Sequence, residues 1–170
     1  MASTSVMDAM SELFNPVERA AWLGFLRSHS ALLRRLDADL RRAHGISISA
    51  YEALIVLGVS ELGSLQMSEL AERTLLTQSG ISRLVTRLER DGLVKRESDP
   101  TDRRASRIAL TEAGDTLMHL GLCTHFAGVR NRFFDRFSEA ELLQLSVYFD
   151  RLTTDAKDED SDRAASRDRC

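Results

Sequence analysis

Residues 66–110 constrain the fold more than any other part of the chain, because four short elements follow one another there with almost no linker between them. Apolar spacing and turn residues predict a short helix, a tight turn, a second helix and then two strands. Helices joined by so short a turn must pack across each other, with the strands as a hairpin beside them. This order would place the second helix in the major groove of DNA and a basic loop next to it.

The first helix of this unit is expected over residues 69–74. Ser68 is predicted to cap its first turn, because a serine hydroxyl can accept one of the free backbone N–H groups there. Leu70 and Ala71 are expected to face inward, and residues 75–76 to carry the chain through the turn. This helix would then support the one that follows.

The second helix is expected over residues 78–91, with Thr77 as its cap and Gly92 as its stop. Four apolar residues recur at the spacing of one helix face and predict a buried stripe: Ile81, Leu84, Val85 and Leu88. The remaining positions project outward: Gln78, Ser79, Ser82, Arg83, Thr86 and Arg87. Serine, glutamine and arginine side chains can bond base edges or phosphates, although an arginine-bearing face can also be ordinary solvated surface.

The context favours DNA binding. Two short strands are expected at residues 93–97 and 105–110, and the turn-rich segment between them ends in Arg103 and Arg104. Residues 78–107 contain eight Lys or Arg and five Asp or Glu, a net charge of 8 − 5 = +3, whereas the whole chain has a net charge of −3. Positive charge is therefore concentrated where a duplex would bind.

Capping signals also mark a helix that precedes this unit. The run Asn15–Glu18 combines an Asn cap, a first-turn Pro and a Glu three residues after the cap. The helix is expected to end near His44, with Gly45 as its stop. Its apolar face is predicted to contain Trp22, Phe25, Leu26, His29, Leu33, Leu36 and Leu40.

Three further helices are expected from the same kind of signal. The run Ser49–Glu52 resembles a capping box and predicts a helix that ends near Glu61. Thr111 is expected to cap a long helix, and the run Ser138–Glu141 to open the last one. The fold class is therefore mainly α with a small β-hairpin wing, an α+β arrangement.

The chain resembles the MarR family of winged helix-turn-helix regulators in two runs, SELAERTLLTQSGISRLVTRLERDGLVKRE and DPTDRRASRIALTEAG. The most specific parts are the wing motif Asp102-Arg103-Arg104 and the L-T-x-x-G motif Leu110–Gly114. The similarity extends over roughly residues 18–152. It implies a winged helix-turn-helix flanked by dimerisation helices, an obligate homodimer, a recognition helix in each major groove, and wing arginines in the neighbouring minor groove.

The resemblance implies a sequence-specific transcriptional regulator, a repressor, that binds a pseudo-palindromic operator in double-stranded DNA. The side chains expected to contact DNA are Ser68, Gln78, Ser79, Ser82, Arg83, Arg87, Lys95, Arg96, Arg103 and Arg104. Asp102 is expected to orient a wing arginine, because a carboxylate close to phosphates is unfavourable. No catalytic residue is expected. A DNA-binding architectural protein without a specific operator is the alternative.

The expected domain organisation follows from these elements. A single MarR-like domain would lie between an N-terminal extension and a disordered tail, and its terminal helices have more apolar surface than one small winged unit can cover. We therefore expect a second copy of the chain to bury that surface. The predicted boundaries are 1–14 for the extension, 15–153 for the domain, about 47–110 for the winged unit, about 15–44 and 111–153 for the dimerisation helices, and 154–170 for the tail.

A small-molecule effector, either aromatic or a phenolic anion, is expected to control DNA release. Related sensors have their pocket between the dimerisation helices and the winged unit, where the candidate residues here are Trp22, Phe25, His29, Tyr51 and His125. Each of these residues is also compatible with a purely structural role. Oxidant sensing through Cys123 is the alternative, although its apolar helical surroundings predict a buried and inert thiol.

Composition limits the remaining classes. Hydrophobic residues make up 43% of the chain and charged residues 29%, as in soluble globular proteins. No apolar run is long enough to span a membrane and the N-terminus lacks a secretory signal pattern, so a cytoplasmic protein without a membrane partner is expected. Neither the two cysteines nor the four histidines have metal-ligand spacing, and no glycine-rich phosphate loop is found. We therefore expect no metal, no cofactor and no enzymatic activity.

Overall fold

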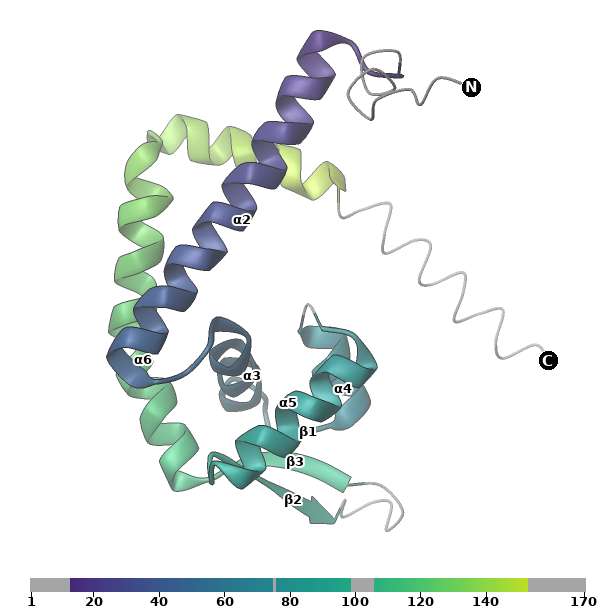
Figure 1. Cartoon of the computed structure of the whole chain (residues 1–170), viewed down its shortest axis with the longest axis vertical. Coiled ribbons are helices and arrows are strands. Elements are labelled where there is room, and N and C mark those ends of the chain that lie inside the picture. Colours follow the sequence, from purple (N-terminus) through teal and green to yellow (C-terminus); the bar gives the residue numbers. More distant parts are fainter. Residues whose placement is uncertain (1–12, 75, 99–105, 153–170) are drawn as a thin grey trace, which may run out of the picture. The chain divides into compact units, whose positions relative to one another are not determined.

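The computed structural model describes residues 13–74, 76–98 and 106–152. These residues group into two compact units that divide between Gly128 and Val129, and each unit is described by itself. Figure 1 traces the elements along the chain. The first unit contains α2 (Pro16–His44), α3 (Ile48–Gly58), β1 (Ser64–Gln66), α4 (Met67–Arg73), α5 (Gln78–Arg90), β2 (Val94–Ser98) and β3 (Ser106–Leu110). Helix α6 (Glu112–Arg132) begins in the first unit and ends in the second.

Helix α2 begins and ends as its sequence predicts. The Asn15 side chain accepts hydrogen bonds from the backbone N–H groups of Val17 and Glu18, and the Glu18 carboxylate accepts the Asn15 N–H at 2.8 Å. Gly45 ends the helix in a left-handed conformation with φ of 70°, which a glycine adopts without a steric penalty. The apolar face is only partly buried, because among its residues Leu36 and Leu40 alone are fully covered within the chain.

Helix α3 begins two residues earlier than the sequence predicted. Ser47 is the N-cap, and its hydroxyl accepts the Ala50 N–H at 3.3 Å, while the Asp37 carboxylate accepts the Ile48 N–H at 2.9 Å. The predicted capping box at residues 49–52 is therefore wrong. Asp37 comes from α2, so the start of α3 depends on a side chain that local sequence patterns do not include.

The sheet has three antiparallel strands in the order β1-β3-β2, and the predicted hairpin supplies only two of them. Strands β2 and β3 pair from Val94 opposite Leu110, within a residue of the predicted ranges. The prediction missed β1, whose three residues are too short to show an alternating pattern. Arg107 on β3 fixes this strand by donating to the carbonyl oxygen of Ser64 at 2.6 Å and to its hydroxyl at 3.0 Å.

The core of the first unit lies among α3, α4, α5 and the sheet, which Figure 1 shows packed together. Its largest fully buried side chain is Tyr51, whose ring lies against Gly121 of α6 so closely that a Cβ on Gly121 would overlap it. The Tyr51 hydroxyl donates to the Met118 carbonyl at 3.0 Å. Tyr51 thus anchors α3 to α6 by packing and by one buried hydrogen bond.

The L-T-x-x-G motif joins the sheet to α6. The Thr111 hydroxyl donates to the Gly92 carbonyl at 2.6 Å and accepts the Gly114 N–H at 3.0 Å, so it caps α6 as predicted. Gly114 packs directly on the carbonyl of Leu93. The motif therefore fastens the first turn of α6 to the turn that follows α5.

The second unit contains the end of α6, a short 3-10 helix over Phe134–Arg136 and a helix from residue 139 to at least residue 152. The predicted capping box at its start is confirmed, because the Ser138 N–H donates to the Glu141 carboxylate at 2.8 Å and the Glu141 N–H to the Ser138 hydroxyl at 3.4 Å. The long helix that Thr111 caps ends at Arg132, since Phe133 leaves the helical conformation. In the parts of the chain with described structure, no helix is both long and apolar enough to cross a membrane.

Candidate nucleic-acid interface

Helix α5 has the two faces that its sequence predicts. Its four apolar residues are buried, with at most 6% of their surface exposed, and all six of its predicted outward polar side chains are exposed. Thr77 caps the helix by accepting the Gly80 N–H at 3.2 Å, and Gly92 follows its end with φ of 73°. The polar face of α5 is thus free to contact a partner, while its apolar face packs in the core.

Contacts along α5 orient its polar side chains. Arg83 donates from Nε to the Ser79 carbonyl at 3.2 Å, and the Thr86 hydroxyl donates to the Ser82 carbonyl at 3.0 Å. Arg87 instead reaches the Ser47 hydroxyl at the start of α3, at 3.5 Å. The two arginines are therefore presented differently: Arg83 lies along the helix, whereas Arg87 leans across to a neighbouring element.

Helix α4 differs from the prediction at its start. Met67 begins the helix, Gln66 is its N-cap, and the Glu69 carboxylate accepts the Gln66 N–H at 2.7 Å. Ser68 is therefore an exposed residue of the first turn, and its predicted capping role is wrong. Its exposure still leaves its hydroxyl accessible to a ligand. The predicted inward positions of Leu70 and Ala71 are confirmed.

The described part of the wing carries two exposed cations on β2. Arg96 contacts Glu89 of α5, with 3.1 Å between Nε and the carboxylate, and Lys95 contacts Glu97 at 2.7 Å. Exposed ion pairs of this kind contribute little free energy, so a phosphate could compete for either cation. The other predicted wing residues, Asp102, Arg103 and Arg104, lie outside the described residues.

Comparisons with known proteins identify the family of this chain. A family model described as MarR family matches residues 44–105. The crystal structure of AbsC, a MarR family transcriptional regulator from Streptomyces coelicolor, is 31% identical with a TM-score of 0.80, and the match covers 85% of this chain and 97% of AbsC. The chain belongs to the MarR family. It is therefore a DNA-binding transcriptional regulator with a winged helix fold, and it is not an enzyme.

Two other relatives of this MarR-family protein are also transcriptional regulators. Sco3205 from Streptomyces coelicolor, a MarR family regulator solved in complex with DNA, is 29% identical with a TM-score of 0.78 over 82% of this chain and 88% of its own. An HTH-type transcriptional regulator of Bacillus cereus is 28% identical over 75% of this chain and 82% of its own length.

The predicted effector residues separate into two groups. Trp22, Phe25 and His29 stack along α2, with ring centroids 6.0 and 6.1 Å apart, and all three are exposed. Tyr51 and His125 form a second pair, 5.4 Å between centroids, where α3 meets α6. Within the described part of the MarR-family chain, no ring contact or hydrogen bond joins the two groups.

His125 has an unusual environment. Its Nδ1 is buried and has no hydrogen-bond partner among the described residues, and its ring also meets Phe126 edge-on at 5.4 Å. Burial lowers the pKa of His125 and raises the pKa of the Tyr51 hydroxyl, so both side chains are neutral near pH 7. A polar ligand atom could satisfy the free nitrogen.

Cys123 lies on the exposed side of α6, so the prediction of a buried thiol is wrong. The buried residues of α6 are Gly114, Met118, Gly121 and Gly128, on the face opposite to Cys123. Two of the apolar residues near Cys123 in the sequence, Leu120 and Phe126, are also exposed in the single chain.

Sequence reasoning missed one group of residues beside α5. Arg41, Ser47 and Ser49, from the end of α2 and the start of α3, line a groove of about 370 Å³ together with Arg83 and Arg87. No local signal could have found this group, since its members meet only when the three helices pack.

Proposed function

We propose that this MarR-family regulator is a cytoplasmic repressor that binds a pseudo-palindromic operator as a homodimer and is released by a small aromatic or phenolic anion. The observation that carries the proposal is the division of α5 into a buried apolar face and an exposed face of glutamine, serine and arginine. Such a helix can enter a major groove without exposing any of its apolar residues.

The DNA contacts follow from the chemistry of each side chain. Arg83 and Arg87 would bind guanine or phosphate, and Gln78, Ser79 and Ser82 would bond base edges or backbone oxygens. Ser68, Lys95 and Arg96 would add contacts from α4 and the wing. We further propose that Arg103 and Arg104 enter the minor groove, with Asp102 orienting one of them.

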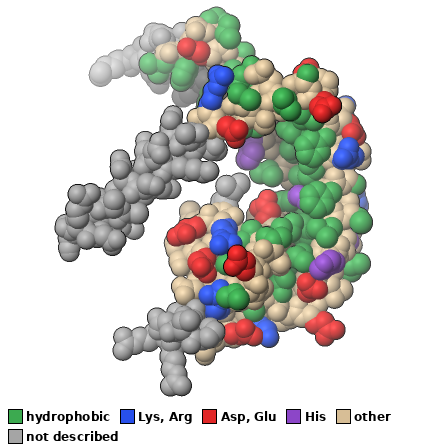
Figure 2. All heavy atoms as spheres, turned by 180° about the vertical axis from the view of Figure 1, so that it is seen from behind, with side chains coloured by type: hydrophobic (Ala, Val, Ile, Leu, Met, Phe, Trp, Pro, Cys, Tyr) green, Lys and Arg blue, Asp and Glu red, His purple; other side chains and the backbone are tan. Residues whose placement is uncertain are grey.

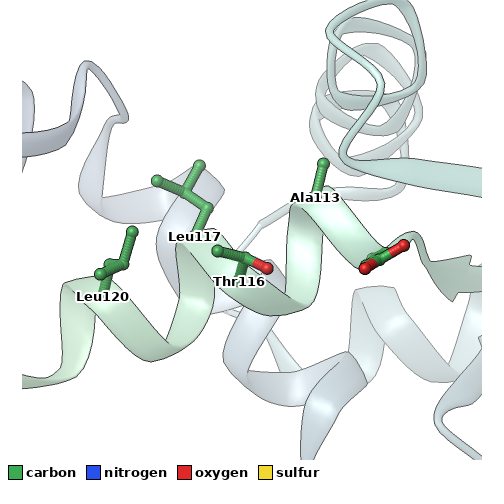
Figure 3. A pocket seen from close by; sticks show the side chains of 5 residues that line it. Ala113, Thr116, Leu117 and Leu120 are labelled. Atoms are coloured by element: carbon green, nitrogen blue, oxygen red, sulfur yellow. The ribbon is translucent and has the colours of Figure 1, made fainter.

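The homodimer is supported by exposed apolar surface. Trp22 is 50% exposed, Leu120 60% and Phe126 58%, values that are costly for large apolar side chains in water. Figure 2 shows hydrophobic side chains gathered along the side of the molecule that includes α6. One face of α6, which includes Leu117 and Leu120, forms an open surface depression (Figure 3), and a second copy of the chain would cover it.

The effector proposal rests mainly on Tyr51 and His125. The unpartnered Nδ1 of His125 and the adjacent aromatic rings would suit a phenol or an aromatic acid. RdhR, which shares the fold at 21% identity with a TM-score of 0.71, is an organohalide-sensing regulator whose structure holds 2,4-dichlorophenol. In the homodimer, Trp22, Phe25 and His29 would contribute further aromatic rings to the pocket.

Oxidant sensing through Cys123 is a second candidate control, favoured by the exposure of its thiol. Peroxide would then weaken DNA binding by the wild type, whereas a Cys123→Ser variant would bind equally with and without peroxide. An equal effect on both proteins would exclude this route.

Selection of duplexes from a random pool, followed by fluorescence anisotropy, tests the proposed function. We expect a two-fold related sequence to emerge. Arg83→Ala and Arg87→Ala should each weaken its binding by about 1–3 kcal/mol. Arg35→Ala, which removes the same charge from an exposed site on α2, is the matched control.

Adding aromatic acids and phenols to the same assay tests the effector proposal. An effector should weaken binding of the selected duplex by the wild type. Recovery of random sequences only would contradict the operator and favour an architectural role. If Arg35→Ala weakened duplex binding as much as Arg83→Ala and Arg87→Ala do, α5 would not be the helix that contacts DNA.

A further inference from the structure

A polar groove runs beside α5 and is formed by three helices. It is lined by Arg83 and Arg87 from α5, by Asp37 and Arg41 from α2, and by Ser47 and Ser49 from the start of α3. A second cavity, of about 260 Å³, shares Arg41, Ser47 and Arg87 with it. The groove is therefore continuous with the exposed face that α5 would present to DNA.

The charge of the groove selects an anion. Its lining contains three arginines and one aspartate, a net charge of 3 − 1 = +2, in a chain whose net charge is −3. The first turn of α3 adds the partial positive charge of a helix N-terminus. Guanidinium groups on this surface would hold a phosphate through paired N–H donors.

Asp37 fixes the position of Arg41. Its carboxylate accepts Nε of Arg41 at 2.6 Å and the Ile48 N–H at 2.9 Å, so one carboxylate ties a side chain of α2 to the backbone of α3. Burial by itself would raise the pKa of Asp37, but the hydrogen bonds from Arg41 and Ile48 outweigh burial and lower the pKa. Asp37 is thus ionised at neutral pH and occupies only the Nε edge of a guanidinium that stays 58% exposed.

Ser47 connects the groove to α5. Its hydroxyl lies 3.5 Å from Nη2 of Arg87 while it caps α3, and Ser49 lies two residues further along the same lining. Two hydroxyls and the outer edges of two guanidinium groups therefore lie around one open space.

We propose that this groove holds a phosphate of the DNA backbone that flanks the major groove contacted by α5, with Arg41, Ser47 and Ser49 as its ligands. The inference rests on the proposed function and adds three DNA-contacting residues outside α5 and the wing. A backbone phosphate fits better than an aromatic effector, because the groove is open, has three arginines in its lining and lies beside the helix that meets the duplex.

The test compares two neighbouring arginines of α2. Arg41→Gln should make the negative slope of log K against log salt for the selected duplex shallower by about 1.8, the value for two lost phosphate contacts, one from each subunit of the dimer, and leave the preferred sequence unchanged. Arg42→Gln is the control, because Arg42 also pairs with an aspartate of α2, at 2.6 Å, but does not line the groove. Equal slopes for Arg41→Gln and the wild type, or equal losses in both variants, would overturn the proposal.

A second variant separates binding from folding. Ser49→Asp places a carboxylate in the first turn of α3, where it is favourable for the helix, so thermal stability should be retained while duplex binding weakens. Undiminished binding by Ser49→Asp would contradict the phosphate site. If the wild type binds no duplex at all, the proposed function fails together with this inference. If only the variants of Arg83 and Arg87 lose binding, the phosphate site alone fails.

The source of the phosphate is tested separately. The Nε–H signal of Arg41 can be followed by NMR while the wild-type protein is titrated with inorganic phosphate alone or with the selected duplex. We expect a saturable shift with the duplex and only a weak one with inorganic phosphate. Saturation by inorganic phosphate at lower concentration than by the duplex would assign the groove to a free anion and overturn the proposal.

Discussion

Gly114 shows how a single residue can be required by a contact that is invisible in the sequence. The absence of a side chain lets the first turn of α6 rest on the carbonyl of Leu93, while Thr111 bonds both Gly92 and Gly114. The L-T-x-x-G motif signals a family resemblance in the sequence, but its physical purpose appears only in this junction. The threonine is explained by local capping, and the glycine by the close approach of two backbone segments.

Gly114→Ala should therefore destabilise the protein by about 1–3 kcal/mol, the cost of forcing a methyl group into a packed contact. Gly24→Ala is the control, because a Cβ at position 24 of α2 would meet no atom within 4 Å. That substitution should be neutral or stabilise by up to about 1 kcal/mol through helix propensity. Urea denaturation of both variants measures the difference, and equal stability of Gly114→Ala and the wild type would refute the contact.

At the scale of elements, the helices differ in whether a nearby side chain alone fixes the residue at which each helix begins. Asn15, Thr77, Thr111 and Ser138 cap helices through side chains within three residues, and the sequence predicted each of them. The starts of α3 and α4 were misplaced, because several residues in each region could cap. The choice between them was made by Asp37 for α3 and by the backbone of Gln66, bonded to Glu69, for α4.

Thr77→Ala should cost about 1 kcal/mol of stability, because it removes the hydroxyl that accepts the Gly80 N–H at the start of α5. Ser68→Ala removes a hydroxyl from an exposed position that caps no helix, and its stability should match the wild type within about 0.5 kcal/mol. Thermal or urea unfolding of the two variants distinguishes them. A loss of stability larger than this in Ser68→Ala would indicate that Ser68 does cap a helix.

At the scale of the whole molecule, the exposed apolar residues mark the surface that a single chain does not bury. Helix α2 buries Leu36 and Leu40 within the chain, whereas Phe25 remains 45% exposed and Leu26 39% exposed on the same face. A helix this amphipathic is stable in water only when its apolar face is covered. The proposed homodimer supplies that cover.

Phe25→Glu should therefore convert the protein to a monomer in sedimentation experiments and abolish tight operator binding, because a charge would replace an apolar contact. Ala20→Glu places the same charge on the opposite face of α2 and should leave a dimer. A wild-type protein that sediments as a monomer at micromolar concentration would contradict the dimer, as would a dimeric Phe25→Glu.

Local patterns in the chain predicted the helices of the winged unit, the two faces of α5 and DNA as the class of partner. Helix periodicity and most caps arise from interactions within about one or two turns, so they are legible in a local pattern. The fold class could be predicted for this reason, although the three-residue strand β1 could not.

Packing between distant segments determines which side chains share a surface. Arg87 meets Ser47 across 40 positions of sequence, and Tyr51 meets His125 across two helices, so no local pattern relates them. The exposure of Cys123 has the same origin, because helix packing selected which face of α6 turned inward. Contacts between distant segments depend on the geometry of several elements at once, and that geometry is fixed only when the core closes around Tyr51 and the stripe of α5.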